Sequence, residues 1–135
     1  MLDIVQRDSV PAFVTKDTSI IREIMAPRNA SVQRQSLAEA TLAPGAATEA
    51  HFHPITEEVY YILRGEGIMA VEGEQRRVGP GDAIGILPGQ RHQIRNNTTE
   101  ELVFLCCCVP AYEDADTIMC EPLFGVVGVA SKTAS

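Results

Sequence analysis

Short runs rich in Val, Ile, Leu and Tyr recur along the chain, and turns containing Gly, Pro or Asn separate them. Runs of this length and composition are typical of β-strands. The pattern predicts strands at residues 20–25, 58–63, 68–72, 75–78, 83–87, 92–96 and 102–109. Gly73 and Glu74 lie between two of these runs and predict a hairpin. Many short strands joined by such turns favour an all-β barrel or sandwich.

Residues 31–42 fit this pattern less clearly, because apolar and polar residues are mixed there. The period of the apolar positions allows a helix. The segments that follow are all predicted strands, however, so two short strands or one bent strand are the favoured interpretation.

The chain has 135 residues, enough for one sizeable core but too few for two. We predict a single domain over residues 1–135 with its core at about 30–110. Residues 1–18 are expected to form an N-terminal arm and residues 111–135 a C-terminal extension. In the extension, Glu113, Asp114 and Asp116 predict a solvated loop, and the apolar residues 123–129 are expected to pack against the domain.

The candidate chemistry centres on the three histidines of the chain, His51, His53 and His92. The first two are two positions apart, which places both on one face of a strand. Glu58 begins the next predicted strand, and His92 begins a later one. Imidazoles and a carboxylate that converge are suitable ligands for a divalent transition metal. The sequence therefore predicts a metal site.

Charge narrows the range of partners. The net charge is −7 and only Lys16 and Lys132 are lysines, so a phosphate backbone would be repelled and nucleic-acid binding is not expected. No apolar stretch reaches the roughly 18 residues of a membrane span. The first ten residues also lack the apolar region of a signal peptide. We predict a cytoplasmic protein without a membrane partner.

The cysteines agree with that compartment, because Cys106, Cys107 and Cys108 are consecutive and Cys120 stands apart, which is not a disulfide framework. Strand alternation would place Cys106 and Cys108 on one face and Cys107 on the other. Small buried thiols that fill a core strand are the favoured interpretation. A reactive or metal-binding thiol near the pocket is the alternative.

Two stretches resemble the two motifs of the cupin superfamily, whose members are small jelly-roll barrels. The first motif is usually written G-x5-H-x-H-x(3,4)-E-x6-G. It runs here from Gly45 through His51, His53 and Glu58 to Gly65, with every spacing kept. Glu57 also falls within the allowed gap, but only Glu58 leaves six residues before the last glycine.

The second motif, usually written G-x5-P-x-G-x2-H-x3-N, runs from Gly81 through Gly89 and His92 to Asn96. Leu87 stands where the family usually has proline, a departure that affects the stiffness of the turn and no metal ligand. Asn96 is expected to bond to the backbone at a strand end.

The resemblance implies a double-stranded β-helix, or jelly roll, whose interior holds one divalent transition metal. The implied ligands are His51, His53, Glu58 and His92. This ligand mix fits Fe, Mn, Ni, Cu or Zn and does not select among them. One or two positions would stay open on a five- or six-coordinate ion, so that substrate or O₂ could bind directly.

If Glu58 points into the barrel, strand alternation places Tyr60 and Ile62 inside as well. The residues between and after them, Val59, Tyr61 and Leu63, then point outward. Tyr60 is therefore the candidate catalytic side chain, with ordinary core packing as the alternative. A surface Glu58 with Glu57 as the ligand is the other arrangement that the motif allows.

The resemblance implies a metal-dependent enzyme that acts on a small organic molecule, either a dioxygenase-type oxidoreductase or a lyase or isomerase. A non-catalytic barrel that binds or senses a small ligand is the alternative, and a structural or storage role is a third. We also predict a homodimer, because pairing across a two-fold axis would cover the edge strands of a small jelly roll.

Overall fold

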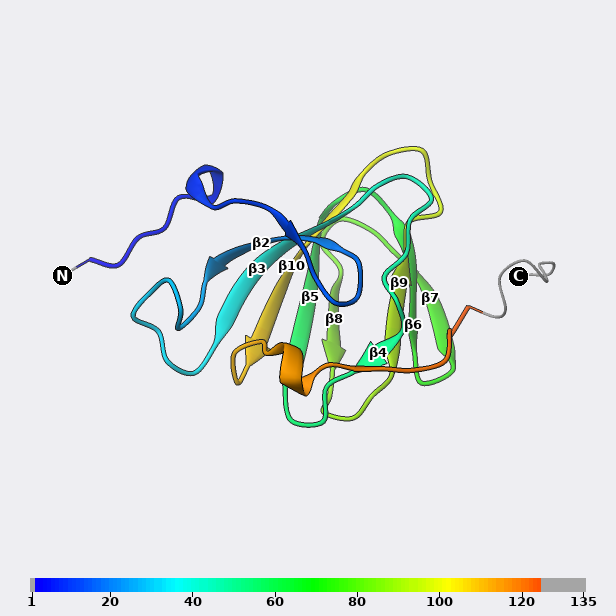
Figure 1. Cartoon of the computed structure of the whole chain (residues 1–135). Coiled ribbons are helices and arrows are strands. Elements are labelled where there is room, and N and C mark those ends of the chain that lie inside the picture. Colours follow the sequence, from blue (N-terminus) through cyan, green and yellow to red (C-terminus); the bar gives the residue numbers. More distant parts are fainter. Residues whose placement is uncertain (1, 125–135) are drawn as a thin grey trace.

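The computed structural model describes residues 2–124, which form two antiparallel β-sheets facing each other (Figure 1). The strands are β1 (Phe13–Val14), β2 (Ile20–Met25), β3 (Ser36–Leu42), β4 (His51–Phe52), β5 (Glu57–Arg64), β6 (Gly67–Val71), β7 (Glu74–Val78), β8 (Ala83–Ile86), β9 (His92–Arg95), β10 (Leu102–Val109) and β11 (Ile118–Met119). Single-turn 3₁₀ helices lie at Arg7–Ser9 and Asp114–Asp116. The predicted all-β fold is confirmed, and residues 31–42 contain one strand, β3.

The six-stranded sheet has the order β1-β2-β3-β10-β5-β8, and the five-stranded sheet has the order β11-β4-β9-β6-β7. Neighbours in these lists are distant in sequence, for example β3 with β10 and β4 with β9. This crossing between two sheets is the double-stranded β-helix that the motifs imply. No helix among residues 2–124 is long and apolar enough to cross a membrane.

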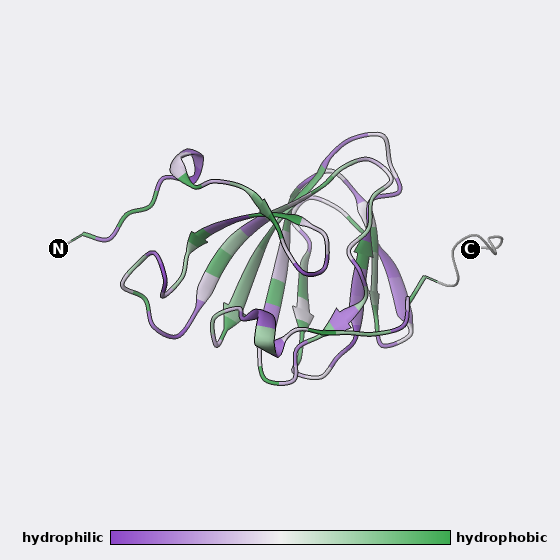
Figure 2. Cartoon of the chain, viewed as in Figure 1, coloured by the Kyte–Doolittle hydropathy of each residue, from purple (hydrophilic) through white to green (hydrophobic). Residues whose placement is uncertain are grey.

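The core lies between the two sheets and receives side chains from both. Ile62 of β5 and Phe104 of β10 meet Met69 of β6 and Ile94 of β9 in one cluster, and each is at most 3% exposed. Burying such a side chain contributes about 1.5–3 kcal/mol. By contrast, β7 is mostly polar and exposed, and Figure 2 shows it as a hydrophilic strand at one edge. A charged edge strand resists pairing with other chains.

β5 shows the predicted alternation, which places one face of the strand in the barrel. Glu58, Tyr60 and Ile62 are buried, whereas Val59 and the other alternate residues are exposed. The neighbouring strand β10 pairs with β5 in the same sheet, and its residues also alternate between buried and exposed near its end. Cys108 is paired there with Glu58.

Asn96 fastens the loop that precedes the first histidine. Its side-chain NH₂ group donates to the backbone carbonyls of Leu42, Ala43 and Glu100. Its backbone carbonyl accepts a hydrogen bond from the backbone N–H of Gly45. The predicted role of Asn96 in bonding backbone is confirmed. This link fixes where the chain enters the segment that carries His51.

The segments that precede and follow the barrel strands in the sequence lie across one end of the barrel. Residues after β10 run from the six-stranded to the five-stranded sheet (Figure 1), because Tyr112 N–H bonds the Ser36 hydroxyl and β11 pairs with β4. Lys16 Nζ donates to the Thr117 carbonyl, which ties the N-terminal segment to this crossing. Of the apolar residues 123–129, Leu123 bonds Gln93, and residues 125–129 lie outside the described residues.

Candidate metal centre

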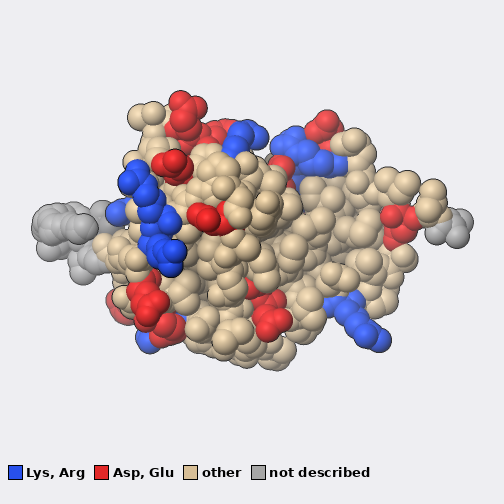
Figure 3. Space-filling model, turned by 180° about the vertical axis from the view of Figure 1, so that it is seen from behind, with Lys and Arg blue, Asp and Glu red and all other residues tan. Residues whose placement is uncertain are grey.

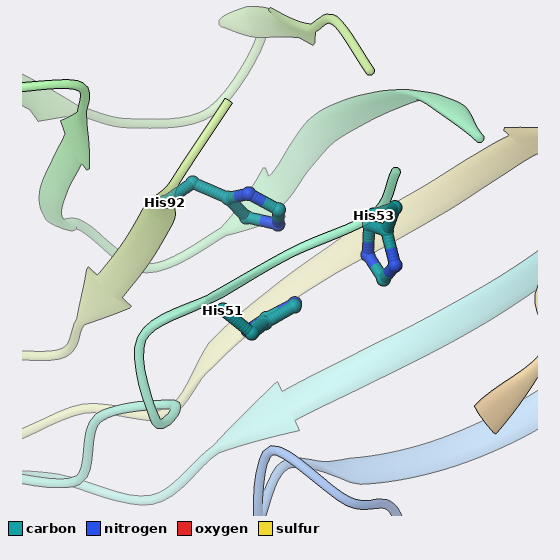
Figure 4. Close-up of side chains that lie close together, drawn as sticks. All are labelled: His51, His53 and His92. Carbon is teal, nitrogen blue, oxygen red and sulfur yellow. The ribbon is translucent and has the colours of Figure 1, made fainter. Parts of the chain in front are cut away.

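The three histidines come together at one place in the barrel (Figure 4). His51 of β4 is paired in register with His92 of β9, and their ring centroids are 4.3 Å apart. His53 lies just after β4, with its ring 5.0 Å from that of His51. Each is at most 3% exposed, and one nitrogen of each lies within 4.8 Å of the others.

The backbone determines which nitrogen of each ring faces inward. Nδ1 of His51 lies 2.8 Å from the Glu49 carbonyl, Nδ1 of His53 lies 3.0 Å from the Asp116 carbonyl, and Nδ1 of His92 lies 3.0 Å from the Gln90 carbonyl. A carbonyl can only accept, so each Nδ1 carries the proton. In a neutral ring Nε2 then has a free lone pair, and a bonded Nδ1–H is the usual partner of a metal-bound histidine.

Glu58 is the carboxylate that joins the histidines. Its Oε1 lies 3.2 Å from Nε2 of His53 and 3.6 Å from Nε2 of His92, whereas Glu57 is exposed. Cys108 Sγ donates to the other oxygen, Oε2, over 3.3 Å. Among the described residues, Glu58 Oε1 and His92 Nε2 are buried without a hydrogen-bond partner. Unpaired buried atoms are costly, and a cation between them would satisfy both.

The protonation of these groups fits a cation site. Burial, with the neighbouring His92, lowers the pKa of His51 to about 4. Burial opposes ionisation of Glu58, but the nearby His53 and His92 outweigh it and lower the pKa of Glu58 to about 2. Burial likewise disfavours a charged His53, yet Glu58 prevails and raises its pKa. The lowered pKa values of His51 and Glu58 fit a divalent ion, which binds neutral imidazole nitrogens and an ionised carboxylate. On His53, a bound cation would replace the proton that Glu58 attracts.

A cavity of about 340 Å³ opens beside this centre. Its wall includes the aromatic side chains of Phe13, Tyr60, Phe104 and Tyr112, together with aliphatic and polar residues. A volume of this size accommodates a small organic molecule. Tyr60 thus lines the pocket as predicted and also packs on Phe104, with ring centroids 4.7 Å apart. Burial raises the pKa of Tyr60 well above its ordinary value, so its hydroxyl keeps its proton.

The cavity is rich in negative charge. Its lining carries five carboxylates and one guanidinium; the carboxylates are Asp17, Glu23, Glu58, Glu113 and Asp114, and the guanidinium is that of Arg28. Arg28 is already paired with Glu23 over 3.3 Å. An anionic guest would therefore meet repulsion unless a bound cation offset it.

The cysteines follow the predicted alternation, with Cys106 and Cys108 buried and Cys107 exposed. Both buried thiols line the cavity, and burial raises their pKa values, so they are not nucleophilic thiolates. Cys108 does more than fill space, because it holds Glu58.

Sequence reasoning missed two aspartates at the centre. Asp17, in the segment predicted as an arm, places Oδ2 3.6 Å from Nε2 of His51. Asp116, in the predicted solvated loop, bonds His53 through its carbonyl, and its carboxylate accepts from the backbone N–H groups of Ile55 and Thr56. That loop prediction is wrong for Asp116, because the loop folds back over the histidine segment.

A double-stranded β-helix with a buried three-histidine cluster defines the cupin class of protein. Residues 38–108, more than half of the chain, match the cupin domain family (Cupin_2), and the chain belongs to this family.

The chain is also similar to three known proteins. Protein MJ1618 of Methanocaldococcus jannaschii is 42% identical over 84% of this chain and 91% of its own length. An oxalate-binding protein of Thermotoga maritima is 34% identical over 50% of this chain and 56% of its own. The solved structure of the polyketide cyclase RemF from Streptomyces resistomycificus superposes with a TM-score of 0.77 at 24% identity, covering 90% of this chain and 87% of that one, a likeness of fold.

Proposed function

We propose that this cupin is a metal-dependent enzyme that converts a small, uncharged, oxygen-bearing organic molecule. The observation that carries the proposal is the set of inward Nε2 atoms and the unpartnered Glu58 Oε1 beside a largely apolar cavity. His51, His53, Glu58 and His92 would hold one divalent transition metal, of the group Fe, Mn, Ni, Cu and Zn. Such an ion supplies Lewis acidity toward a substrate carbonyl or hydroxyl oxygen.

The cavity walls favour proton-transfer chemistry of the lyase or isomerase type. Tyr60 and Tyr112 both line the cavity, and burial raises the pKa of each, so both hydroxyls keep their protons. The Tyr112 hydroxyl donates to Asp114, so Tyr60 is the hydrogen-bond donor proposed to orient a substrate oxygen. Burial also raises the pKa of Glu23, which suits a carboxyl group that takes up and returns a proton. The polyketide cyclase RemF has a similar fold. The negatively charged lining of the cavity disfavours a dianionic substrate such as oxalate.

Turnover assays on metal-reconstituted protein test this function. The substrates would be uncharged hydroxy- and keto-aromatics on one side and dicarboxylates, including oxalate, on the other, with products followed by mass spectrometry and O₂ uptake recorded. We expect conversion among the uncharged compounds without O₂ uptake. Stoichiometric O₂ uptake would favour the dioxygenase alternative. Saturable binding without conversion would favour the non-catalytic ligand-binding or sensing module.

Cys108 offers a test of how the carboxylate is held. Cys108→Ala removes the only thiol that donates to Glu58 within residues 2–124 and is expected to weaken Mn²⁺ binding by about tenfold, the lower range for an outer-shell partner, because S–H is a weak donor. Cys106→Ala, two positions away on the same face of β10, is the matched control. Equal Kd values for the two variants in a competition titration would contradict the role of Cys108.

The predicted homodimer remains a proposal. Val59, Tyr61 and Leu63 are 40–42% exposed on the outer face of the six-stranded sheet, which supports it. The face seen from behind also has a wide area without charged side chains (Figure 3). Light scattering is expected to give twice the chain mass of 14.6 kDa, and a single species at the chain mass would refute the dimer.

A further inference from the structure

Asp17 is held in one orientation by its neighbours. Its Oδ1 accepts hydrogen bonds from the Thr15 hydroxyl, the Ser19 hydroxyl and the Ser19 backbone N–H, at 2.6–3.0 Å. Its backbone carbonyl accepts from Glu49 N–H, and the carbonyl of Glu49 in turn accepts from His51. One residue therefore positions both Asp17 and His51. With Oδ1 occupied, Oδ2 remains for the cavity side.

The atom that Oδ2 faces is another acceptor. His51 donates through Nδ1 to Glu49, so Nε2 of the neutral ring presents a lone pair to Asp17 at 3.6 Å. Two acceptors at this distance repel each other unless a cation lies between them. Glu58 Oε1 has the same relation to His92, also at 3.6 Å. One carboxylate from β5 and one from the N-terminal segment therefore lie beside the histidine cluster.

We propose that Asp17 is a second carboxylate ligand of the metal, so that the centre has three imidazoles and two carboxylates. With metal bonds of about 2.0–2.2 Å, adjacent ligand atoms lie about 3 Å apart on a six-coordinate ion and about 3.5 Å apart in a tetrahedron. The Asp17–His51 separation of 3.6 Å is close to these distances, and binding would draw the two atoms together by at most about 0.6 Å. The inference rests on the proposed metal site and extends it by a residue outside the matched family region of 38–108.

This ligand set restricts the substrate. Five protein donors leave a six-coordinate ion one open position, whereas His51, His53, Glu58 and His92 alone would leave two. Binding a substrate and O₂ side by side needs two positions, so the set favours a substrate held through a single oxygen. The two carboxylates also balance the charge of a divalent ion, which leaves little attraction for an anionic substrate.

Asp17→Asn tests the proposal with Mn²⁺ as the probe. The asparagine carbonyl can accept the bonds made by Thr15 and Ser19, while its NH₂ group replaces the ligating oxygen and can donate to His51 Nε2. The fold is thus retained and one ligand is lost. Glu23→Gln is the matched control, because it removes one charge from the same cavity but its carboxylate pairs with Arg28.

We expect Asp17→Asn to raise the Kd for Mn²⁺ by at least about tenfold and to increase the water-proton relaxivity of the bound ion, because water takes the vacated position. Glu23→Gln should change neither. Ser19→Ala, which loosens Oδ1 but keeps the carboxylate, should raise the Kd by a smaller factor and serves if the asparagine variant fails to fold. The proposal would be overturned if Asp17→Asn had the same Kd and relaxivity as Glu23→Gln. It would also be overturned if Ser19→Ala left the Kd unchanged.

The wild-type protein separates this inference from the proposed function. If it binds Mn²⁺ and Asp17→Asn behaves as expected while no substrate is converted, the ligand assignment holds and the enzymatic function fails. If the wild-type protein binds none of the five candidate metals, both are overturned.

Discussion

Replacing His53 with alanine is expected to weaken the binding of a divalent transition metal by roughly 100-fold or more. A structural Zn²⁺ gains about 10–16 kcal/mol from its four ligands, so one ligand contributes about 3 kcal/mol, which is a factor of about 100 in Kd. Elemental analysis after purification and competition titration with Mn²⁺ or Zn²⁺ measure the loss. Metal at 100 times the wild-type Kd should also stabilise the wild-type fold by about 2.7 kcal/mol, and this gain should fall to about 0.4 kcal/mol or less at the same concentration in His53→Ala.

Thr117→Val provides the matched control for that variant. The Thr117 hydroxyl lies 3.4 Å from Nδ1 of His53 and donates to the Glu113 carbonyl, so the change disturbs the same crossing segment without removing a ligand. It should keep about one metal ion per chain. A His53→Ala protein with undiminished metal content, or a Thr117→Val protein that loses as much, would contradict the site.

Much of the candidate site was predictable because its spacing is local. Strand alternation acts over a few residues, so an inward Glu58 carries Tyr60 with it, and both are buried in β5. His51 and His53 share a side for the same reason. The glycines of the motifs mark turns, which depend on φ angles at single residues. Asn96 is different, because its bonds to Leu42 and Ala43 span more than 50 residues and only the motif indicated its role. The fold class followed from the same alternation repeated over many strands.

The aspartates were not predictable, because their contacts depend on how distant segments fold over the barrel. His53 and Asp116 are 63 residues apart, and no periodicity relates them. The only local signal at Asp17 is the bond from Ser19 N–H to its side chain, an Asx turn, which indicates a turn but not what the free oxygen faces. Identifying site residues on such segments therefore requires the three-dimensional structure.

Leu87 shows a departure from the motif that the structure explains. Its backbone N–H donates to the side-chain carbonyl of Gln90 over 2.8 Å, a bond that a proline at this position could not make. The Gln90 backbone carbonyl, in the same turn, accepts from His92. The hydrogen bond thus replaces the stiffness of proline in the turn that presents a candidate ligand.

Gly65→Ala is expected to destabilise the metal-free protein by about 2–5 kcal/mol, the sum of about 1–2 kcal/mol for the φ angle and about 1–3 kcal/mol for the steric overlap. Gly65 has φ +83°, where an L-residue costs about 1–2 kcal/mol. In addition, a Cβ there would overlap the Glu101 carbonyl oxygen and lie 2.9 Å from Cα of Leu102. These are backbone atoms at the start of β10, so the turn between β5 and β6 could open only by parting from that strand. Urea denaturation of the chelator-treated protein measures the free energy of unfolding.

Two other glycines separate these effects. Gly45 has φ +79° but open space around its Cβ position, so Gly45→Ala should cost only about 1–2 kcal/mol. Gly85 in β8 has open space and no positive φ, and Gly85→Ala should be neutral or stabilise by up to about 1 kcal/mol, because it lowers the entropy of the unfolded chain. A Gly65→Ala cost equal to that of Gly45→Ala would show that the clash relaxes. Gly65, the last glycine of the first motif, would then be required only for its φ angle. The close approach of the β5–β6 turn to β10 would not constrain β5, the strand that carries Glu58.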